Sequence, residues 1–286
     1  MASRYEIFCK TIETGNFTRT AEELGYSQSA ISQAIKTLEG ELGHTLIDRR
    51  KDGVILSRDG QSFFPYIQDI CAAETALRKK QLEMKGMENS VIRIGAFTSI
   101  TRNLLPTLMK EFKNRYPNVC FEVQQGDYTV IEQKIRAGQV DFGFIITDTS
   151  PQLDHRPLCA DNMMAVLPAN HHLAGEECLS LAQLAREPFI LLDEGDYSGT
   201  MLSFRRKGLS PRVEYKVHDD YSILLMVQQG MGVSMVYQML LNNYDHDILI
   251  KPIADAAPRT IALAWNNWQT LPRAARKFAE FIIKNT

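Results

Sequence analysis

The segment from Asn16 to Gly60 constrains the fold most, because its pattern predicts two short helices, a tight turn between them and a basic hairpin after them. Ala21 and Leu24 supply the inner stripe of the first helix, and Gly25 follows where a left-handed backbone costs least. Ser27 then stands in position to cap the second helix. This layout is typical of a helix-turn-helix DNA-binding domain with a wing.

The second helix has a polar outward face. Its inner face is Ile31, Ile35 and Leu38 at helical spacing. The other side chains are short and polar or carry amides, so they can approach base edges in the major groove, where Gln can pair with adenine. With one residue of the first helix and the basic hairpin, the candidate DNA contacts are Thr18, Ser27, Gln28, Ser29, Ser32, Gln33, Lys36, Arg49, Arg50 and Lys51.

Charge alone predicts only weak DNA binding by a single copy. Residues 1–58 carry eight basic and eight acidic side chains, so this segment is formally neutral. Neutralisation of phosphates by clustered Lys and Arg provides most of the non-specific affinity for DNA. We therefore expect useful binding to require two or more copies, each with its local cluster at residues 49–51.

The same stretch resembles the N-terminal domain of the LysR-type transcriptional regulators. The family pattern Ser-Gln-(Pro/Ser)-Ala-(Val/Ile)-Ser matches Ser27–Ser32, and Ile-Lys-x-Leu-Glu-x-x-Leu-Gly matches Ile35–Gly43. Its Leu-Phe-x-Arg signature appears at Leu46–Arg49, with Ile47 in place of Phe, an apolar exchange that keeps the packing role. The resemblance implies binding to double-stranded promoter DNA, assembly into a homodimer or homotetramer, a contact with RNA polymerase, and no association with a membrane.

A long helix is predicted from about Arg58 to Lys85, capped by Ser57. At 1.5 Å per residue it would be about 40 Å long, more than a small domain needs for its own core. It is either packed along its own chain or a linker helix that pairs with a partner copy. The apolar seam for such pairing, at alternating four- and three-residue steps, is Phe63, Ile67, Ile70, Leu77 and Met84.

From Val91 onward, alternating strands and helices predict an α/β domain. The expected strands are Val91–Phe97, Cys120–Gln125 and Asp141–Ile146, and the expected helices are Leu104–Tyr116 and Val130–Ala137. The phrases that resemble the LysR-type effector domain are Leu105-Pro106 with Tyr116–Val119, Ile135–Gly143 and Gly230–Ser234. The resemblance implies two lobes, as in periplasmic solute-binding proteins. The predicted fold class is therefore mixed: an all-α winged helix-turn-helix domain, a linker helix and an α/β two-lobed effector domain.

The predicted boundaries follow from these patterns. The DNA-binding domain is expected at 1–58, the linker helix and hinge at 59–89, and the effector domain at 90–286. The first lobe would hold about 90–160 and 265–286, and the second about 161–264. The chain would cross near Cys159–Val166 and return near Arg259–Ala264, and a last helix, Pro272–Lys284, would pack on the first lobe.

The effector is expected between the lobes, at the carboxyl ends of strands. Thr98 and Ser99 precede a helix, so hydroxyl and backbone N–H groups could converge there on an anion; simple helix capping is the alternative. If at least two of the acidic residues at neighbouring strand ends line the cleft, they favour a ligand with both signs of charge, whereas acids on surface loops are the common alternative. The expected effector is a carboxylate-bearing or amino-acid-like metabolite. The candidate residues are Thr98, Ser99, Ile100, Asp127, Thr147, Asp148, Ser198, Gly199, His218 and Asp219.

Other functional classes find little support in the sequence. It has no catalytic or nucleotide-binding signature of the Gly-x-Ser-x-Gly, phosphate-loop, His-Glu-x-x-His or dinucleotide type, so no catalytic residue, cofactor or metal is expected. His171-His172 follows a Pro168-Ala169-Asn170 turn and is predicted to lie in an exposed loop, with a metal-binding pair as the less favoured alternative. No apolar run approaches the roughly 18 residues of a membrane span, and a cytoplasmic location is expected. A metabolite-binding enzyme remains a weak alternative.

A thiol-based sensor of the same family is the other alternative. The five cysteines have no short paired spacing, which argues against a zinc site or a disulfide framework. Cys159 and Cys178 are the pair best placed for such a role. The acidic residues near them, Asp161, Glu176 and Glu177, disfavour the thiolate that this chemistry requires.

Overall fold

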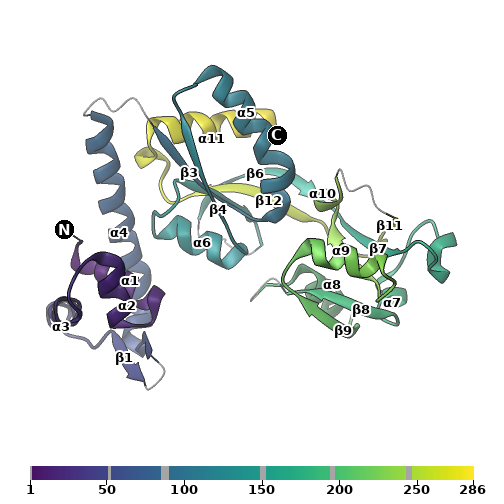
Figure 1. The fold of residues 1–286 in the computed structure, drawn as a ribbon, viewed down its shortest axis with the longest axis horizontal. Coiled ribbons are helices and arrows are strands. Elements are labelled where there is room, and N and C mark those ends of the chain that lie inside the picture. Colours follow the sequence, from purple (N-terminus) through teal and green to yellow (C-terminus); the bar gives the residue numbers. More distant parts are fainter. Residues whose placement is uncertain (1, 51–52, 85–89, 149–152, 194–196, 243–246) are drawn as a thin grey trace. The chain divides into compact units, whose positions relative to one another are not determined.

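The computed structural model describes the 286-residue chain except residues 1, 51–52, 85–89, 149–152, 194–196 and 243–246 (Figure 1). The chain divides into two compact units. The first contains Met1–Lys85 and Arg136–Gln139, and the second contains Gly86–Ile135 and Val140–Thr286. None of the described helices is long and apolar enough to span a lipid bilayer.

The first unit is a bundle of short helices with a β-hairpin and a long helix. Its elements are α1 (Arg4–Thr14), α2 (Phe17–Leu24), α3 (Gln28–Leu42), β1 (Ile47–Arg50), β2 (Gly53–Leu56) and α4 (Arg58–Met84). The predicted helix pair, hairpin and long helix are confirmed. The sequence reasoning did not predict α1, whose Ile7 and Phe8 pack in the same core as Ile31, Ile35 and Leu38.

The predicted helix ends are also confirmed. Gly25 ends α2 with a φ of 72°, and the Ser27 hydroxyl accepts a hydrogen bond from the Ala30 amide at 3.2 Å. The Ser57 hydroxyl caps α4 by accepting from the Gly60 amide at 2.8 Å. Local sequence therefore determines where α2 ends and where α3 and α4 begin.

The apolar seam of α4 differs from the prediction. Phe63 and Ile67 pack into the core of their own unit, where Ile67 is 2% exposed. The exposed apolar stripe instead contains Tyr66 (69% exposed), Ile70 (39%), Ala73 and Leu77 (62%), again at steps of four, three and four residues. Ile70 and Leu77 belong to both seams, while the side chain of Met84 lies outside the described part. The seam shifts because α1 covers the Ile67 side of the helix.

The first lobe of the second unit is built on a five-stranded sheet with the order β4-β3-β5-β12-β6. Its strands are β3 (Val91–Ala96), β4 (Cys120–Gln125), β5 (Phe142–Ile146), β6 (Asp154–Asp161) and β12 (Arg259–Trp265). The first three run parallel, as predicted for an α/β domain, and β12 is antiparallel to both β5 and β6.

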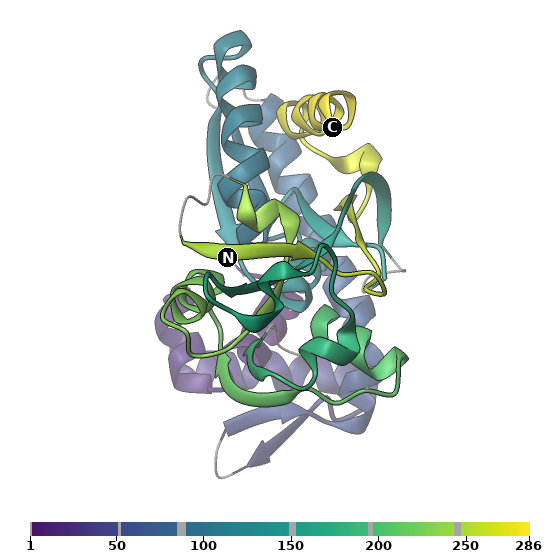
Figure 2. The ribbon, with the colours of Figure 1, turned by 90° about the vertical axis from the view of Figure 1, so that its right-hand side faces the viewer.

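Helices cover both faces of this sheet (Figure 1). One face holds the short π-helix η1 (Ile100–Leu104), α5 (Leu105–Arg115) and α11 (Arg273–Asn285), and the other holds α6 (Tyr128–Arg136). The strand period of two explains the division: Leu263 points into the α5–α11 core, while Ala262 and Ala264 face α6. Figure 2 shows α11, in yellow, beside α5, which confirms the predicted return of the last helix to the first lobe.

The second lobe contains two small sheets and their covering helices. Antiparallel β10 (Ser234–Tyr237), β7 (Met163–Pro168) and β11 (Ile248–Pro252) form one sheet, and parallel β8 (Pro188–Leu192) and β9 (Arg212–Val217) form the other. The remaining elements of the C-terminal half are η2 (His172–Gly175), α7 (Leu181–Leu184), α8 (Gly199–Arg206), α9 (Asp220–Gln228), α10 (Gln238–Leu241) and η3 (Trp268–Thr270).

The chain passes between the lobes at two places, and one lies earlier than predicted. The outward crossing at Asn162, between β6 and β7, falls within the predicted range. The return precedes Arg259, because β12 pairs with β6 along its whole length in the first-lobe sheet. The predicted return at Arg259–Ala264 and the second lobe of 161–264 are therefore wrong at this end, and the first lobe begins again at β12.

A buried helical glycine gives a direct test of the packing in the first unit. A Cβ atom at Gly60 would lie 1.9 Å from the backbone oxygen of Leu46, whereas a Cβ at Gly40 in α3 would meet nothing within 4 Å. We expect Gly60→Ala to destabilise this unit by about 1–3 kcal/mol or more through overpacking. Gly40→Ala, the matched control, should be neutral or stabilising by about 1 kcal/mol. Urea unfolding followed by circular dichroism measures both, and equal stability of the two variants would contradict this packing.

Candidate functional site

The outward face of α3 is open to solvent along its length. Gln28, Ser29, Gln33 and Lys36 are exposed, opposite an inner face that is fully buried. Amide and hydroxyl groups on an open helix face are the groups that read base edges in a major groove. The structure therefore leaves these predicted contacts accessible to DNA.

The other predicted DNA contacts have structural roles as well. Ser27 caps α3, and half-buried Ser32 accepts a hydrogen bond from Arg49 Nη2 at 3.2 Å. The guanidinium carbon of Arg49 also lies 4.7 Å from the centroid of the Phe17 ring, so the side chain is held beside α2 and α3. Arg50 is exposed on β1 at the hairpin, as is Thr18 on α2. Lys51 lies outside the described residues.

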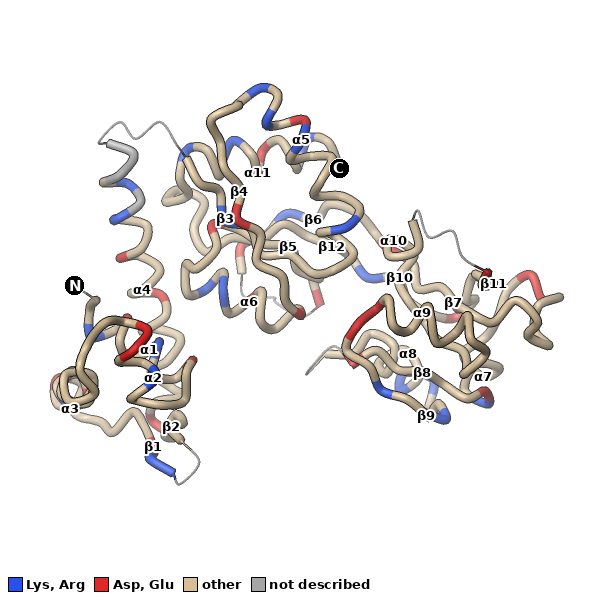
Figure 3. Tube along the Cα trace, in the orientation of Figure 1, with Lys and Arg blue, Asp and Glu red and all other residues tan. Residues whose placement is uncertain are grey.

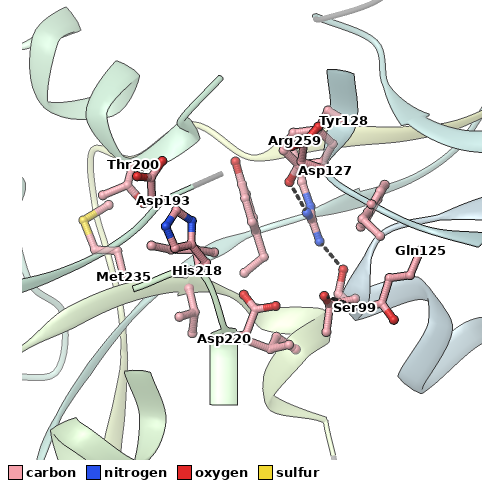
Figure 4. A pocket seen from close by; sticks show the side chains of 17 residues that line it. Ser99, Gln125, Asp127, Tyr128, Asp193, Thr200, His218, Asp220, Met235 and Arg259 are labelled. Atoms are coloured by element: carbon pink, nitrogen blue, oxygen red, sulfur yellow. Dashed lines mark hydrogen bonds between the residues drawn. The ribbon is translucent and has the colours of Figure 1, made fainter. Parts of the chain in front are cut away.

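A cavity of about 470 Å³ lies between the two lobes of the second unit (Figure 4). The first lobe contributes the segments after β3 and β4 and the start of β12, and the second contributes the segments after β8 and β9 together with β10. This volume lies within the range of pockets that enclose small molecules. The cavity is therefore the candidate effector site.

Arg259 lies at the centre of the first-lobe wall and is almost fully buried. Its Nε and Nη2 donate to Asp161 Oδ2 at 3.0 and 2.6 Å. Nη2 also donates to Ser99 Oγ at 2.7 Å and Nη1 donates to the Tyr128 hydroxyl at 2.7 Å, as Figure 4 shows. Burial opposes its charge, but Tyr128 and Asp161 outweigh burial and raise the pKa of Arg259. These four bonds leave one N–H of Nη1 without a partner among the described residues.

Two aromatic rings enclose the same guanidinium group. Its central carbon lies 4.8 Å from the ring centroid of Phe97 in the first lobe and 3.9 Å from that of Tyr237 in the second. Cation–π contacts of this kind are worth about 2 kcal/mol or more when desolvated. Arg259 therefore links the lobes at the cavity, in addition to its hydrogen bonds within the first lobe.

A second polar network crosses the cavity mouth. The Thr98 hydroxyl accepts from Gln125 Nε2 at 2.9 Å and bonds to the Asp220 carboxylate on the other lobe. Burial raises the pKa of Asp220, although the bond from Thr98 and the charge of Arg259 act in the opposite direction. The loss of hydration at Asp220 therefore outweighs the favourable bond from Thr98 and the favourable charges of Arg259 and Arg102.

Among the charged residues of the described lining, three are aspartates and one is an arginine, while most of the other lining residues are apolar or uncharged polar. The three aspartates, Asp127, Asp193 and Asp220, line the cavity and are half-buried. Asp127 also caps α6, because its carboxylate accepts a hydrogen bond from the Val130 amide. Arg259 is the one Lys or Arg among the described lining residues, and Asp161 already neutralises it. Figure 3 shows acidic residues at the start of α9, where the chain enters the site.

Four of the ten predicted effector residues line this cavity: Thr98, Ser99, Asp127 and His218. Ile100 is a core residue that is completely buried, so its placement in the site is wrong. The remaining five do not line the cavity: Thr147, Asp148, Ser198, Gly199 and Asp219. Ser198 and Asp219 instead cap α8 and α9, and Gly199 lets the Tyr237 hydroxyl approach, since a Cβ there would lie 2.3 Å from it.

Sequence reasoning missed the residues that β12, β10 and the start of α6 bring to the site. Arg259, Tyr237 and Tyr128 line the cavity, yet they lie far apart in the chain and follow no spacing pattern. The signal that could have found Arg259 is a lone arginine that begins an otherwise apolar strand, Arg259–Trp265. Such a charge requires a partner in the core.

The cysteines do not support thiol sensing. Cys159 lies in β6 of the first lobe and Cys178 lies just before α7 of the second, and burial followed by the charge of Asp161 raises the pKa of Cys159. The two thiols that do approach each other are Cys9 and Cys71, whose sulfur atoms are 3.6 Å apart. The hydrogen bond with Cys71 and burial raise the pKa of Cys9, so the reactive thiolate is disfavoured there too.

Comparison with known proteins identifies the family of both parts of the chain. Residues 3–61 match the bacterial regulatory helix-turn-helix protein domain of the lysR family, and residues 85–286 match the LysR substrate binding domain. The HTH-type transcriptional regulator ShiR of Corynebacterium glutamicum is 33% identical over 242 residues, which cover 80% of each chain.

Solved structures of similar proteins agree. HinK, a LysR family transcriptional regulator from Pseudomonas aeruginosa, matches with a TM-score of 0.62 and 25% identity over 99% of this chain and 97% of its own. Full-length CbnR in complex with its target DNA shares the fold, with a TM-score of 0.61 and 18% identity over 99% of both chains. The chain therefore belongs to the LysR family of transcriptional regulators, DNA-binding proteins whose helix-turn-helix domain precedes an effector-binding domain.

Proposed function

We propose that the effector of this regulator is a small metabolite with a cationic amine or guanidinium group as well as a polar or carboxylate end, as in an amino acid. The observation that carries the proposal is the charge of the cavity: Asp127, Asp193 and Asp220 line it, while Asp161 neutralises Arg259. A half-buried carboxylate gains most from a ligand that brings a positive charge to it. A purely anionic ligand would be repelled by three carboxylates, and the Arg259 guanidinium group has only one N–H left to donate to it.

The polar end of such a ligand has two donors available on the opposite wall. Ser99 Oγ accepts from Arg259, so its own O–H can point to the ligand, and Arg259 Nη1 keeps one N–H. The sequence predicted that hydroxyl and backbone N–H groups at Thr98 and Ser99 converge on an anion, and the structure adds Arg259 as a partner of Ser99. Removal of the Ser99 hydroxyl should now also disturb Arg259.

Closure of the lobes is the proposed consequence of binding. Contacts already cross between them: Thr98 bonds to Asp220, and the Arg102 guanidinium carbon lies 3.7 Å from the Tyr221 ring centroid. A ligand held by both walls favours the arrangement in which these contacts form. It acts only through its different affinities for the two arrangements, and subunit packing would carry the change to the DNA-binding domains.

On DNA, we propose that α3 enters the major groove and that the hairpin contacts phosphates. The open face of α3 and the exposed Arg50 support these roles, as does the complex that CbnR forms with its target DNA. We also propose homodimers joined through the Tyr66, Ile70, Ala73 and Leu77 stripe of α4, with tetramers as the larger assembly, acting in the cytoplasm where promoter DNA is found. Contact with RNA polymerase is a further expectation from the family.

The effector class can be tested with named compounds. L-lysine, L-arginine and putrescine should raise the thermal midpoint of the full chain, whereas succinate and benzoate should not. Asp220→Asn should weaken the best ligand by about 1–3 kcal/mol, the cost of a lost bond to a charged group. Differential scanning fluorimetry and calorimetry provide the measurements. Asp148→Asn, an exposed acid at the end of β5 outside the cavity, is the matched control. Stabilisation by the dicarboxylate alone would overturn the proposal.

The same carboxyl group predicts a pH dependence. Burial raises the pKa of Asp220 in the free protein, and a bound cation would hold this group ionised. Affinity should therefore be full above that raised pKa and fall as the pH drops through it. Since a raised folded-state pKa destabilises the fold at higher pH, Asp220→Asn should raise the ligand-free midpoint at pH 7 while removing this pH dependence. An unchanged pH profile in the variant would show that another group titrates.

Two substitutions distinguish a proposed base contact from a proposed phosphate contact. Gln33→Ala should cost about 1–3 kcal/mol on the preferred operator and little on random DNA, because it reads a base. Arg50→Ala should weaken both alike and reduce the salt slope by about one unit, because it neutralises a phosphate. Fluorescence anisotropy with both DNAs at several salt concentrations tests this. Equal losses on the two DNAs for Gln33→Ala would reassign it to the backbone.

Dimer formation depends on the exposed stripe of α4. Leu77→Glu should dissociate the dimer and abolish tight operator binding, because it places a charge in an apolar interface. Gln61→Glu adds the same charge to an exposed position off the stripe and should leave the dimer intact. Sedimentation equilibrium compares the two. A wild-type chain that sediments as a monomer at micromolar concentration would contradict dimerisation.

A further inference from the structure

Three possible metal ligands meet in the second lobe, outside the effector cavity. His171 and His172 follow β7, and Glu187 stands just before β8. His171 Nε2 lies 3.5 Å from Glu187 Oε2, and His172 Nε2 lies 3.3 Å from Glu187 Oε1. The prediction that these histidines are exposed is correct for His172, whose side chain is 65% exposed. It is wrong for His171, whose side chain is only 12% exposed. Glu187 lies too far along the chain for a sequence motif to include it.

We propose that His171, His172 and Glu187 bind a divalent transition-metal cation of the zinc type. Two imidazoles and a carboxylate are a common protein ligand set for Zn²⁺, with a fourth position left to water. Imidazole nitrogen selects such metals over Mg²⁺ and Ca²⁺, which prefer oxygen ligands. The carboxylate also offsets part of the cation's charge.

The spacing of the ligand atoms supports the proposal. A tetrahedral Zn²⁺ with ligands at about 2.0–2.1 Å holds those ligands about 3.3–3.4 Å apart. His171 Nε2 lies 3.5 Å from one oxygen of the Glu187 carboxylate and His172 Nε2 lies 3.3 Å from the other, and one ligand atom from each of the three residues lies within 4.8 Å of the other two. The exposed His172 ring can move to bring all three ligand atoms to the tetrahedral spacing.

Metal binding requires one local change. His171 Nδ1 accepts a hydrogen bond from the Leu173 amide at 3.3 Å, which places the ring proton on Nε2 toward Glu187. To ligate through Nε2, the neutral ring must carry its proton on Nδ1 instead, so the Leu173 contact is given up. The ring gains and loses one proton, and its charge does not change. The cost is one long hydrogen bond at the start of η2.

The consequence of a bound metal would be structural. It would join the segment after the central strand β7 to the segment that leads into β8, and thus connect the two sheets of the second lobe. A ligand that binds only the folded state stabilises it in proportion to its affinity and concentration. The metal should therefore raise the thermal midpoint, and its role is independent of which metabolite occupies the cavity.

The test uses the untagged full-length protein, stripped with a chelator and titrated with Zn²⁺ by calorimetry. We expect a site of one equivalent whose affinity falls at least tenfold in His172→Ala and in Glu187→Gln. His155→Asn, which removes an imidazole outside this cluster, should bind like the wild type. Zn²⁺ should raise the thermal midpoint of the wild type but not of Glu187→Gln. Unchanged affinity in the His172→Ala, Glu187→Gln double variant would overturn the proposal.

Cobalt separates this site from the cysteines. Co²⁺ held by nitrogen and oxygen ligands should give visible d–d absorption without the near-ultraviolet charge-transfer band of a thiolate. Loss of the visible bands in Glu187→Gln would support the assignment. A thiolate band, or visible bands that persist in that variant, would place the metal elsewhere and refute it.

Discussion

The buried ion pair between Arg259 and Asp161 is the interaction on which the regulatory unit depends. Asp161 ends β6, where the chain leaves the first lobe, and Arg259 begins β12, where it returns. Asp161 also accepts a hydrogen bond from the Met239 amide of α10, and Arg259 lies against Tyr237 of β10. One charge pair thus holds both crossings and one wall of the cavity. Removal of either partner would leave the other charge buried, at a cost of about 3–5 kcal/mol.

This pairing also determines the chemistry that the cavity favours. Because Asp161 pairs with the guanidinium group, the proposed ligand would meet Asp127, Asp193 and Asp220 as the acidic side chains of the described lining. Burial raises the pKa of Asp220, and the proposed cationic ligand would offset the loss of hydration of this carboxylate. A site that is costly when empty gives the ligand the differential binding energy that a population shift requires.

The DNA-binding unit follows a different physical logic. Its first 58 residues are formally neutral, so the recognition that we propose relies on the open face of α3 and on the local basic hairpin rather than on total charge. The long helix α4 has two apolar faces. Ile67 packs into the core of its own unit, and Tyr66, Ile70 and Leu77 lie exposed on a different face of the helix. A single helix can thus hold a domain and offer an apolar surface to a second copy.

Much of the fold was readable from the sequence, and part of the site was. The caps at Ser27 and Ser57, the ending at Gly25 and the strands at 91–96, 120–125 and 142–146 follow from interactions within a few residues, so the sequence by itself determined them. Thr98, Ser99, Asp127 and His218 were found because they stand at strand or helix ends. Arg259, Tyr128, Tyr237 and the seam of α4 were decided only by the tertiary structure. Their roles depend on partners far along the chain, and strand order and helix packing, which no local pattern encodes, select those partners.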